Sequence, residues 1–160
     1  MSKQLKLDIK EKKNKNQKKI VFGVILLCTS IFLFLSFNSF WFNWKTDYDK
    51  VENGWKIMSE YYNNTNNILG WIGAYTSNFF IKFLGINAYG LILILFGLSI
   101  KLIFKLKFNY FTFFRKITIT MLWGLIFLGF IMKKLDFHGY TYGKIGENIN
   151  IALHHLISDI

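Results

Sequence analysis

The residues closest to a catalytic motif in this 160-residue chain lie between Gly139 and Ile145. A phosphate-binding loop has two glycines separated by four residues, followed by Lys and then Ser or Thr, so that backbone N–H groups hold the phosphates and the hydroxyl holds Mg²⁺. Here one residue too few separates Gly139 from Gly143, and Ile145 follows Lys144 where the hydroxyl is needed. The motif therefore predicts no nucleotide hydrolysis by this route.

The histidines do not form a metal-binding pattern. His154 and His155 are adjacent, so on a helix their side chains diverge instead of facing one ion. His155 and Asp159 do share a helix face, and His138 and Glu147 lie upstream. A polar helix face at a membrane interface accounts for these residues better than a metal site. The sequence indicates neither a metal nor a cofactor.

The composition indicates an integral membrane protein. Apolar residues make up 52% of the chain, aromatic residues make up 19%, and much of this content forms long uninterrupted runs. A soluble domain of this size would interrupt such runs to keep its surface wet. The only cysteine, Cys28, lies inside one run, so no disulfide framework or thiolate zinc site is expected. No acidic residue falls within a predicted span, which argues against a cation-coupled transporter.

Basic residues gather beside the apolar runs. Eight of the twenty lie in the first nineteen positions, and five more lie in 101–116, which holds no acidic residue. Such clusters are typical of the cytoplasmic side of a membrane protein. Residues 1–19 therefore predict a cytoplasmic tail, either disordered or loosely helical. The tail could also attract anionic lipid headgroups or contact DNA non-specifically, but the topological interpretation is preferred.

Three segments fit membrane spans. Residues 20–42 combine an uncharged run of eighteen residues with an aromatic belt, and a run of that length covers roughly 27 Å. Residues 87–104 end at basic residues, and residues 116–133 form a shorter span that needs some tilt. We predict an all-α integral membrane protein in which residues 20–160 form one membrane domain, with the amino terminus in the cytoplasm.

Residues 68–84 are the ambiguous segment. They are long enough for a short span but include Ser77, Asn78 and Lys82, and a lysine costs roughly 2.5–3.5 kcal/mol at the centre of a span. If this segment crossed, the basic loop at 101–116 would lie outside, against the charge rule. We therefore predict two glycine-led amphipathic or re-entrant helices on the outer face, at 68–84 and 143–158.

Glycines inside the predicted spans indicate helix packing. Gly90 and Gly97 lie on one face of the second span, and Gly124 and Gly129 lie close together in the third. Small residues allow helix backbones to approach each other closely in a membrane. The spacing is not Gly-x-x-x-Gly, but these four glycines are the candidate packing residues of the spans.

A longer pattern begins at Asn67 and continues to the end of the chain. A glycine-led aromatic helix is followed by a turn that opens a span, a basic loop, a further span and a second glycine-led segment. The positions that carry this order are Gly70, Gly73, Ala74, Gly85, Ala88, Tyr89, Gly143 and Gly146. Over residues 18–160 the pattern resembles the amino-terminal membrane domain of the FtsK/SpoIIIE family of bacterial DNA translocases. The chain departs from it in having no proline and in carrying Gly at position 90.

The resemblance implies a membrane anchor at the division septum, which forms homo-oligomers and contacts other division proteins. The family continues into a last span, an ATPase motor and a DNA-binding domain, so we expect this chain to be the anchoring domain or a truncated form, without enzyme activity of its own. The alternative interpretation is a small stand-alone integral membrane protein, such as an accessory subunit or a pore former.

Overall fold

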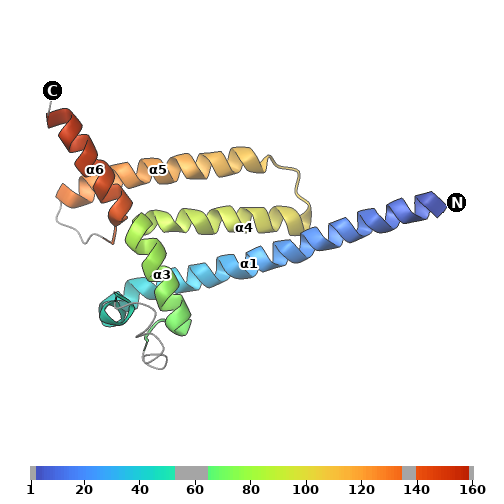
Figure 1. Ribbon diagram of the computed structural model, residues 1–160, viewed down its shortest axis with the longest axis horizontal. Helices are drawn as coiled ribbons and strands as arrows, with labels where there is room; N and C mark the ends of the chain where they lie inside the picture. Colours follow the sequence, from blue (N-terminus) through green and yellow to red (C-terminus); the bar gives the residue numbers. More distant parts are fainter. Residues whose placement is uncertain (1–2, 53–64, 135–139, 159–160) are drawn as a thin grey trace.

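The computed structural model describes residues 3–52, 65–134 and 140–158. Within these ranges all regular structure is helical: α1 (Lys3–Glu52), α3 (Gly70–Leu84), the 3₁₀ helix η1 (Gly85–Ala88), α4 (Tyr89–Phe104), α5 (Tyr110–Lys134) and α6 (Gly143–Ser158). Helices α1, α4 and α5 form a layer with α4 in the middle, and α3 and α6 cross the layer steeply at the same end (Figure 1).

Three helical stretches are long and apolar enough to cross a membrane: Lys13–Lys45, Gly70–Phe104 and Tyr110–Ile131. The second stretch contains α3, η1 and α4, and the chain changes direction between α3 and α4 (Figure 1). The predicted all-α membrane fold with three spanning helices is therefore confirmed. The turn at η1 leaves α4 aligned with the other spans and α3 inclined to them.

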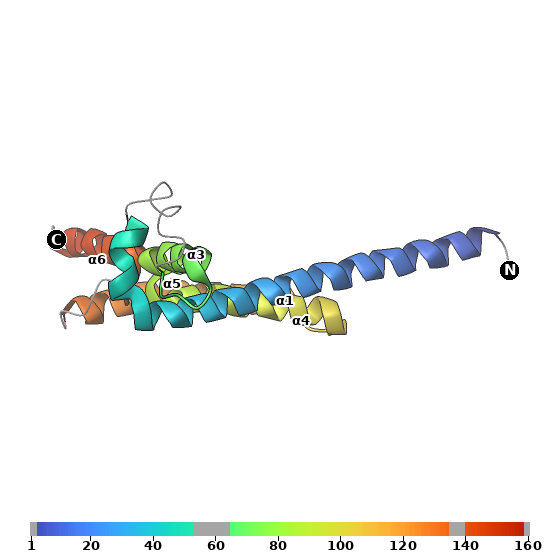
Figure 2. The same cartoon turned by 90° about the horizontal axis from the view of Figure 1, so that it is seen from below.

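Helix α1 continues through the basic tail. Of the two alternatives for this segment, the structure shows the helical one, with the helix beginning at Lys3. Residues 3–19 contain neither glycine nor proline and are rich in lysine, which is a good helix former. The amino-terminal part of α1 consequently projects beyond the other helices, as Figure 2 shows from a second direction.

The buried core lies where α1, α3 and α4 meet. Phe37 of α1 is fully buried, and its ring lies 6.0 Å from that of Phe80 and 5.7 Å from that of Tyr89. The other buried apolar side chains of this cluster are Leu33, Phe40, Ile81, Ala88 and Ile92. Many large apolar side chains outside the cluster are exposed, Trp123 and Phe130 of α5 among them. An exposed apolar surface of this extent suits helices surrounded by lipid.

Candidate functional site: the helix crossings at the capped end

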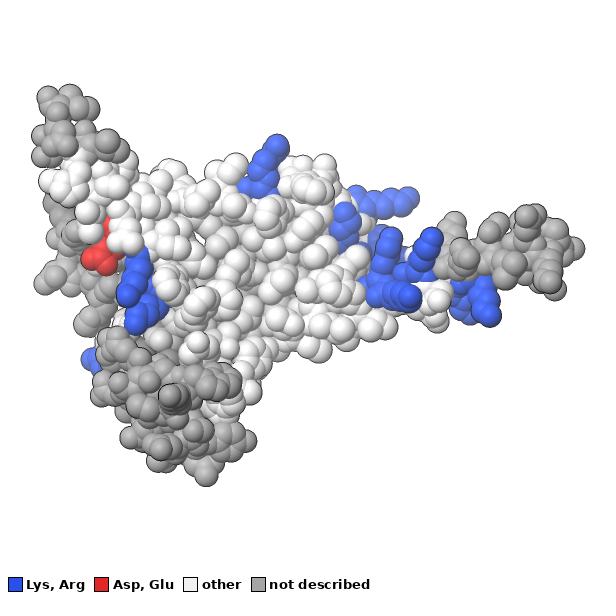
Figure 3. Space-filling view, in the orientation of Figure 1, with Lys and Arg blue, Asp and Glu red and all other residues white. Residues whose placement is uncertain are grey.

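The two ends of the helix layer differ in chemistry. We call the end that α3 and α6 cross the capped end, and the opposite end, with the α4–α5 turn and the start of α1, the basic end. Lysine and arginine side chains gather at the basic end in Figure 3, where the middle of the layer is almost free of charge. The charged ends and apolar middle are the distribution that a bilayer selects. The contacts that attach α3 and α6 to the layer lie at the capped end.

Helix α3 is attached to α1 through hydrogen bonds between buried polar groups. The hydroxyl of Ser36 on α1 donates to the carbonyl oxygen of Gly73 at 2.7 Å, and the amide of Asn67 donates to the carbonyl oxygen of Ser36 at 3.2 Å. The backbone N–H of Ile68 donates to the hydroxyl oxygen of Ser39 at 2.9 Å. Hydrogen bonds gain strength where water is excluded. This set of contacts therefore holds α3 at a defined position along α1.

Two side chains organise the segment that leads into α3. Asn67 is 5% exposed, and its Oδ1 atom accepts a hydrogen bond from the backbone N–H of Leu69 at 3.1 Å. The carboxylate of Asp47, near the end of α1, accepts the backbone N–H of Asn66 at 2.9 Å. Both bonds satisfy N–H groups next to a helix start, which have no partner inside the helix itself. The bond from Asn66 to Asp47 adds a further contact with α1, and the bond from Leu69 to Asn67 shapes the segment itself.

Helix α6 is attached to α5 in a different way, by close backbone contact. A Cβ added at Gly146 would lie 2.8 Å from the carbonyl oxygen of Leu125, and one added at Gly129 would meet both Gly146 and the Asn150 amide. The Asn150 amide donates to the carbonyl oxygens of Ile126 at 3.1 Å and of Gly146 at 2.8 Å. The absence of side chains at Gly129 and Gly146 is thus what permits the crossing.

The two glycine-led helices are built alike. Each begins with a glycine in the left-handed region, Gly70 with φ 62° and Gly143 with φ 71°. In each, the residue four positions after the second glycine returns a hydrogen bond to that glycine's carbonyl oxygen: Ser77 does so at 2.7 Å and Asn150 at 2.8 Å. The same local design therefore places α3 against α1 and α6 against α5.

The corner between α3 and α4 touches the start of α6 backbone to backbone. The N–H of Ile86 donates to the carbonyl oxygen of Thr141 at 3.0 Å. A Cβ at Gly85, which has φ 61°, would collide with that carbonyl, and a Cβ at Gly143 would collide with the backbone of Phe83 and Gly85. Each of the two glycines has a positive φ and also lies against the backbone of another segment. Other residues do not tolerate this combination, because their Cβ atom disfavours the positive φ and would collide with that backbone. This junction joins the α1–α3 unit to the α5–α6 unit.

The four predicted packing glycines all lie at helix contacts. Gly90 and Gly97 of α4 face Met121 and Phe113 of α5, and Gly124 of α5 faces the side-chain oxygen of Asn87. Gly129 faces α6 as described above. The structure also uses a fifth glycine that sequence reasoning missed: Gly23 of α1 lies against Ser99, Leu102 and Ile103 of α4.

The remaining positions of the long sequence pattern lie around the core. Ala74 and Ala88 are buried, and Tyr89 packs edge-on against Phe37 as the first residue of α4. Beside Tyr89 an apolar hollow of about 420 Å³ is lined by Trp41, Ile86, Tyr89 and Thr141. Pattern residues thus meet α1 and the segment before α6 at the capped end.

The polar groups that attach α3 were not identified as a site from the sequence. Ser36, Ser39, Asn43 and Asp47 recur at intervals of three or four residues, which places them on one helix face. That periodicity was the available signal, in a stretch otherwise notable for its aromatic residues. For metals, no group of three His, Cys, Asp or Glu side chains in the described ranges is placed to hold an ion.

The whole chain can be compared with known proteins and protein families. No characterised protein and no solved structure gives a significant match to the chain. One family model does match, described as the 4TM region of DNA translocase FtsK/SpoIIIE, and it covers residues 15–160. The matched range includes the first spanning stretch from Lys15 onward, the other two spanning stretches, and both glycine-led helices. The chain belongs to the family of FtsK/SpoIIIE 4TM membrane regions.

Proposed function

We propose that this chain anchors an FtsK-like DNA translocase in the bacterial plasma membrane at the division septum, acting in cell division and chromosome segregation. The observation that carries the proposal is membership of the 4TM-region family over residues 15–160. The domain forms homo-oligomers and contacts other division proteins, while DNA translocation is the activity of the family's ATPase motor and not of these membrane helices. Its own contribution is position: it keeps the translocase in the membrane where the septum closes.

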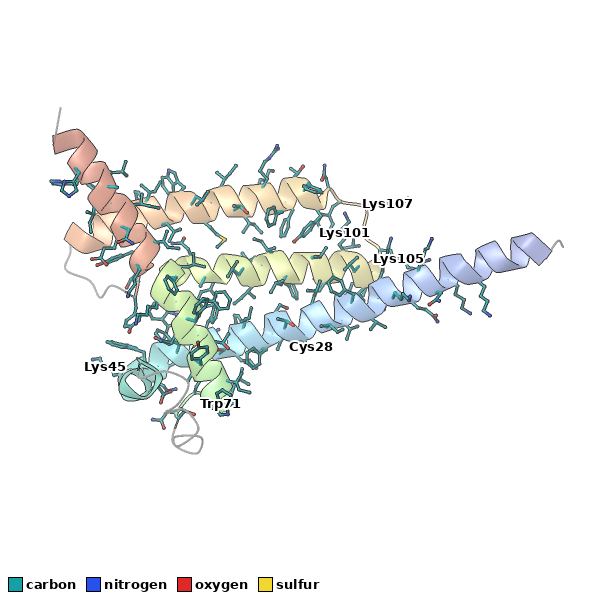
Figure 4. The ribbon with its side chains drawn as sticks, viewed as in Figure 1. Cys28, Lys45, Trp71, Lys101, Lys105 and Lys107 are labelled. Carbon is teal, nitrogen blue, oxygen red and sulfur yellow. The ribbon has the colours of Figure 1, made fainter. Side chains whose placement is uncertain are left out.

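The proposed topology places the basic end in the cytoplasm and the capped end outside. It is supported by the lysines at the end of α4 and in the α4–α5 turn. Lys101, Lys105 and Lys107 are labelled in Figure 4 and lie on the same side as the start of α1. Lys45 and Trp71 lie toward the opposite end. Positive charge retained on the cytoplasmic side accounts for this asymmetry. Helices α3 and α6 then lie along the outer membrane interface.

Septal anchoring is testable with a fluorescent fusion of residues 1–160 in dividing bacteria that contain the wild-type translocase. We expect the ratio of fusion signal to membrane-dye signal to be higher at septa than along the lateral membrane. Normalisation to the dye is needed because a septum contains two apposed membranes. A membrane protein with unrelated spans serves as the control. An equal ratio at septa and lateral membrane would contradict the anchoring function.

The position of α3 can be measured by spin labelling. Ile72, Phe79 and Phe83 form an exposed apolar stripe along the helix, whose 15 residues extend over roughly 22 Å. With Cys28 replaced by alanine, single cysteines at the three positions should report similar shallow depths in the bilayer, from the ratio of oxygen to nickel-chelate accessibility. A helix that crossed the membrane would instead give depths that change steadily along the stripe. That result would overturn the interfacial placement of α3.

A further inference from the structure

The α4–α5 turn combines exposed cations with exposed apolar side chains. Lys105 and Lys107 are exposed, and the Nζ atom of Lys101 lies 5.5 Å from the centre of the Phe108 ring. Between these lysines, Phe104 is 68% exposed and Leu106 is 44% exposed. The turn thus presents charge and apolar surface together, at the end of a helix that is otherwise apolar.

Lys105 has a backbone conformation that does not suit lysine. Its φ of 52° and ψ of 39° are left-handed, and it is the only residue other than glycine with a positive φ in the described part of the chain. Its N–H bonds to the carbonyl oxygen of Lys101, as does the N–H of Leu106 at 3.2 Å, so the position ends α4. Glycine is the residue that such helix ends favour. A strained residue that persists suggests a use for its side chain.

Lysines from α1 lie beside this turn. Gly23 of α1 packs against Leu102 and Ile103 of α4, which places the preceding turn of α1 next to the end of α4. Lys18 and Lys19 occupy that turn and are exposed. We define the basic collar as Lys18, Lys19, Lys101, Lys105 and Lys107. The acidic side chains with described surroundings, Asp47 and Glu147, lie in or beside the capped-end contacts of α3 and α6.

We propose that the basic collar binds the phosphate groups of anionic glycerophospholipids. The collar lies where the apolar length of the spans ends, which is the depth of the headgroups. Lysine stems cover apolar surface while their ammonium groups reach the phosphates, and Phe104 and Leu106 can enter the acyl region beneath. Duplex DNA matches this surface less well, because it would leave both apolar side chains in water.

The inference predicts selectivity among lipids, measured on the whole chain reconstituted in phosphatidylcholine vesicles. Trace spin-labelled phosphatidylglycerol or phosphatidylcholine reports, by electron paramagnetic resonance, the fraction of lipid immobilised by the protein. Each lysine near an anionic headgroup contributes about a fivefold preference. A headgroup within reach of two collar lysines, such as Lys105 and Lys107, should therefore associate on the order of twenty-five times more strongly at 0.01 M salt, where the screening length is about 30 Å. The preference should collapse at 1 M salt, where that length is about 3 Å.

Lys105→Gly is the decisive variant, because it removes a charge and relieves the strained φ in one change. We expect it to lower the preference for phosphatidylglycerol about fivefold without lowering thermal stability. Lys107→Gln should have a similar effect through charge alone, and Lys105→Arg should keep the preference. The matched control is Lys144→Gln, which removes an exposed lysine of α6 from the capped end and should leave selectivity unchanged.

Three results would overturn the inference. The wild-type chain could retain both lipids equally at low salt, or Lys105→Gly could behave like Lys144→Gln. Alternatively, a short duplex DNA in the aqueous phase could bind the wild-type chain while phosphatidylglycerol showed no preference over phosphatidylcholine, which would assign the collar to nucleic acid. The inference requires only that the chain is embedded in a membrane, so loss of septal localisation and loss of lipid selectivity are distinguishable failures.

Discussion

Replacing Gly143 with alanine is expected to lower the free energy of unfolding by about 3–5 kcal/mol. Gly143 has φ 71°, and a Cβ there would collide with backbone atoms of Phe83 and Gly85. Backbone atoms cannot move aside as a flexible side chain can, so α6 must shift away from the corner between α3 and α4. The measurement is the sodium dodecyl sulfate titration of helicity in mixed micelles, followed by circular dichroism.

Gly70→Ala is the matched control for this prediction. Gly70 begins α3 as Gly143 begins α6 and has a similar φ of 62°, but a Cβ there would meet nothing within 4 Å. Only the conformational cost remains, about 1–2 kcal/mol. The difference between the two variants isolates the junction between the α1–α3 and α5–α6 units. Equal losses in the two variants would show that backbone crowding at Gly143 contributes nothing.

Replacing Asn67 with alanine is expected to cost about 2–3 kcal/mol. The buried side chain donates to the carbonyl oxygen of Ser36 and accepts the N–H of Leu69. Its removal leaves an N–H at the start of α3 without its partner and breaks one of the bonds that fix α3 to α1. The same detergent titration measures the loss, and a cysteine label on Trp71→Cys in a Cys28→Ala background should become more mobile.

The control for Asn67 is Asn38→Ala. The Asn38 amide donates to the carbonyl oxygen of Phe34, one turn earlier in the same helix, in an exposed setting. Removing an exposed local bond changes stability by no more than about 0.5 kcal/mol. A loss at Asn38 as large as that at Asn67 would mean that the contact between α1 and α3 carries no special weight.

The fold class could be predicted because bilayers restrict sequences strongly. Backbone polar groups in lipid must be satisfied within a helix or a closed barrel, so long uncharged runs such as Ile20–Phe37 indicate spanning helices directly. The beginnings of the helices were less visible. Helix α5 begins at Tyr110, six residues before the predicted span at 116–133, because aromatic residues before Arg115 continue a helix as readily as they end one.

The capped-end contacts could be predicted only in outline. Gly143 and Gly146 were recognised as positions of a family pattern, but their partners, Gly85 and Leu125, are distant in sequence. Ser36 illustrates the same difficulty, since a serine in an apolar run is compatible with bonding inside its own helix, as Ser30 does to the carbonyl oxygen of Leu27. Only the crossing of α3 over α1 brings the carbonyl oxygen of Gly73 to 2.7 Å from the hydroxyl of Ser36.

The sequence alone determined the helical spans, the clusters of basic residues beside them and the family. Hydropathy and charge act residue by residue along the chain, so they can be recognised without knowledge of the fold. The tertiary structure decided how the pieces meet. It alone showed that Gly85 and Gly143 share one junction, that Ser36 and Asn67 hold α3 across α1, and that Lys105 ends α4 in a strained conformation. These features depend on backbone geometry and on contacts between distant segments, which no local pattern of residues specifies.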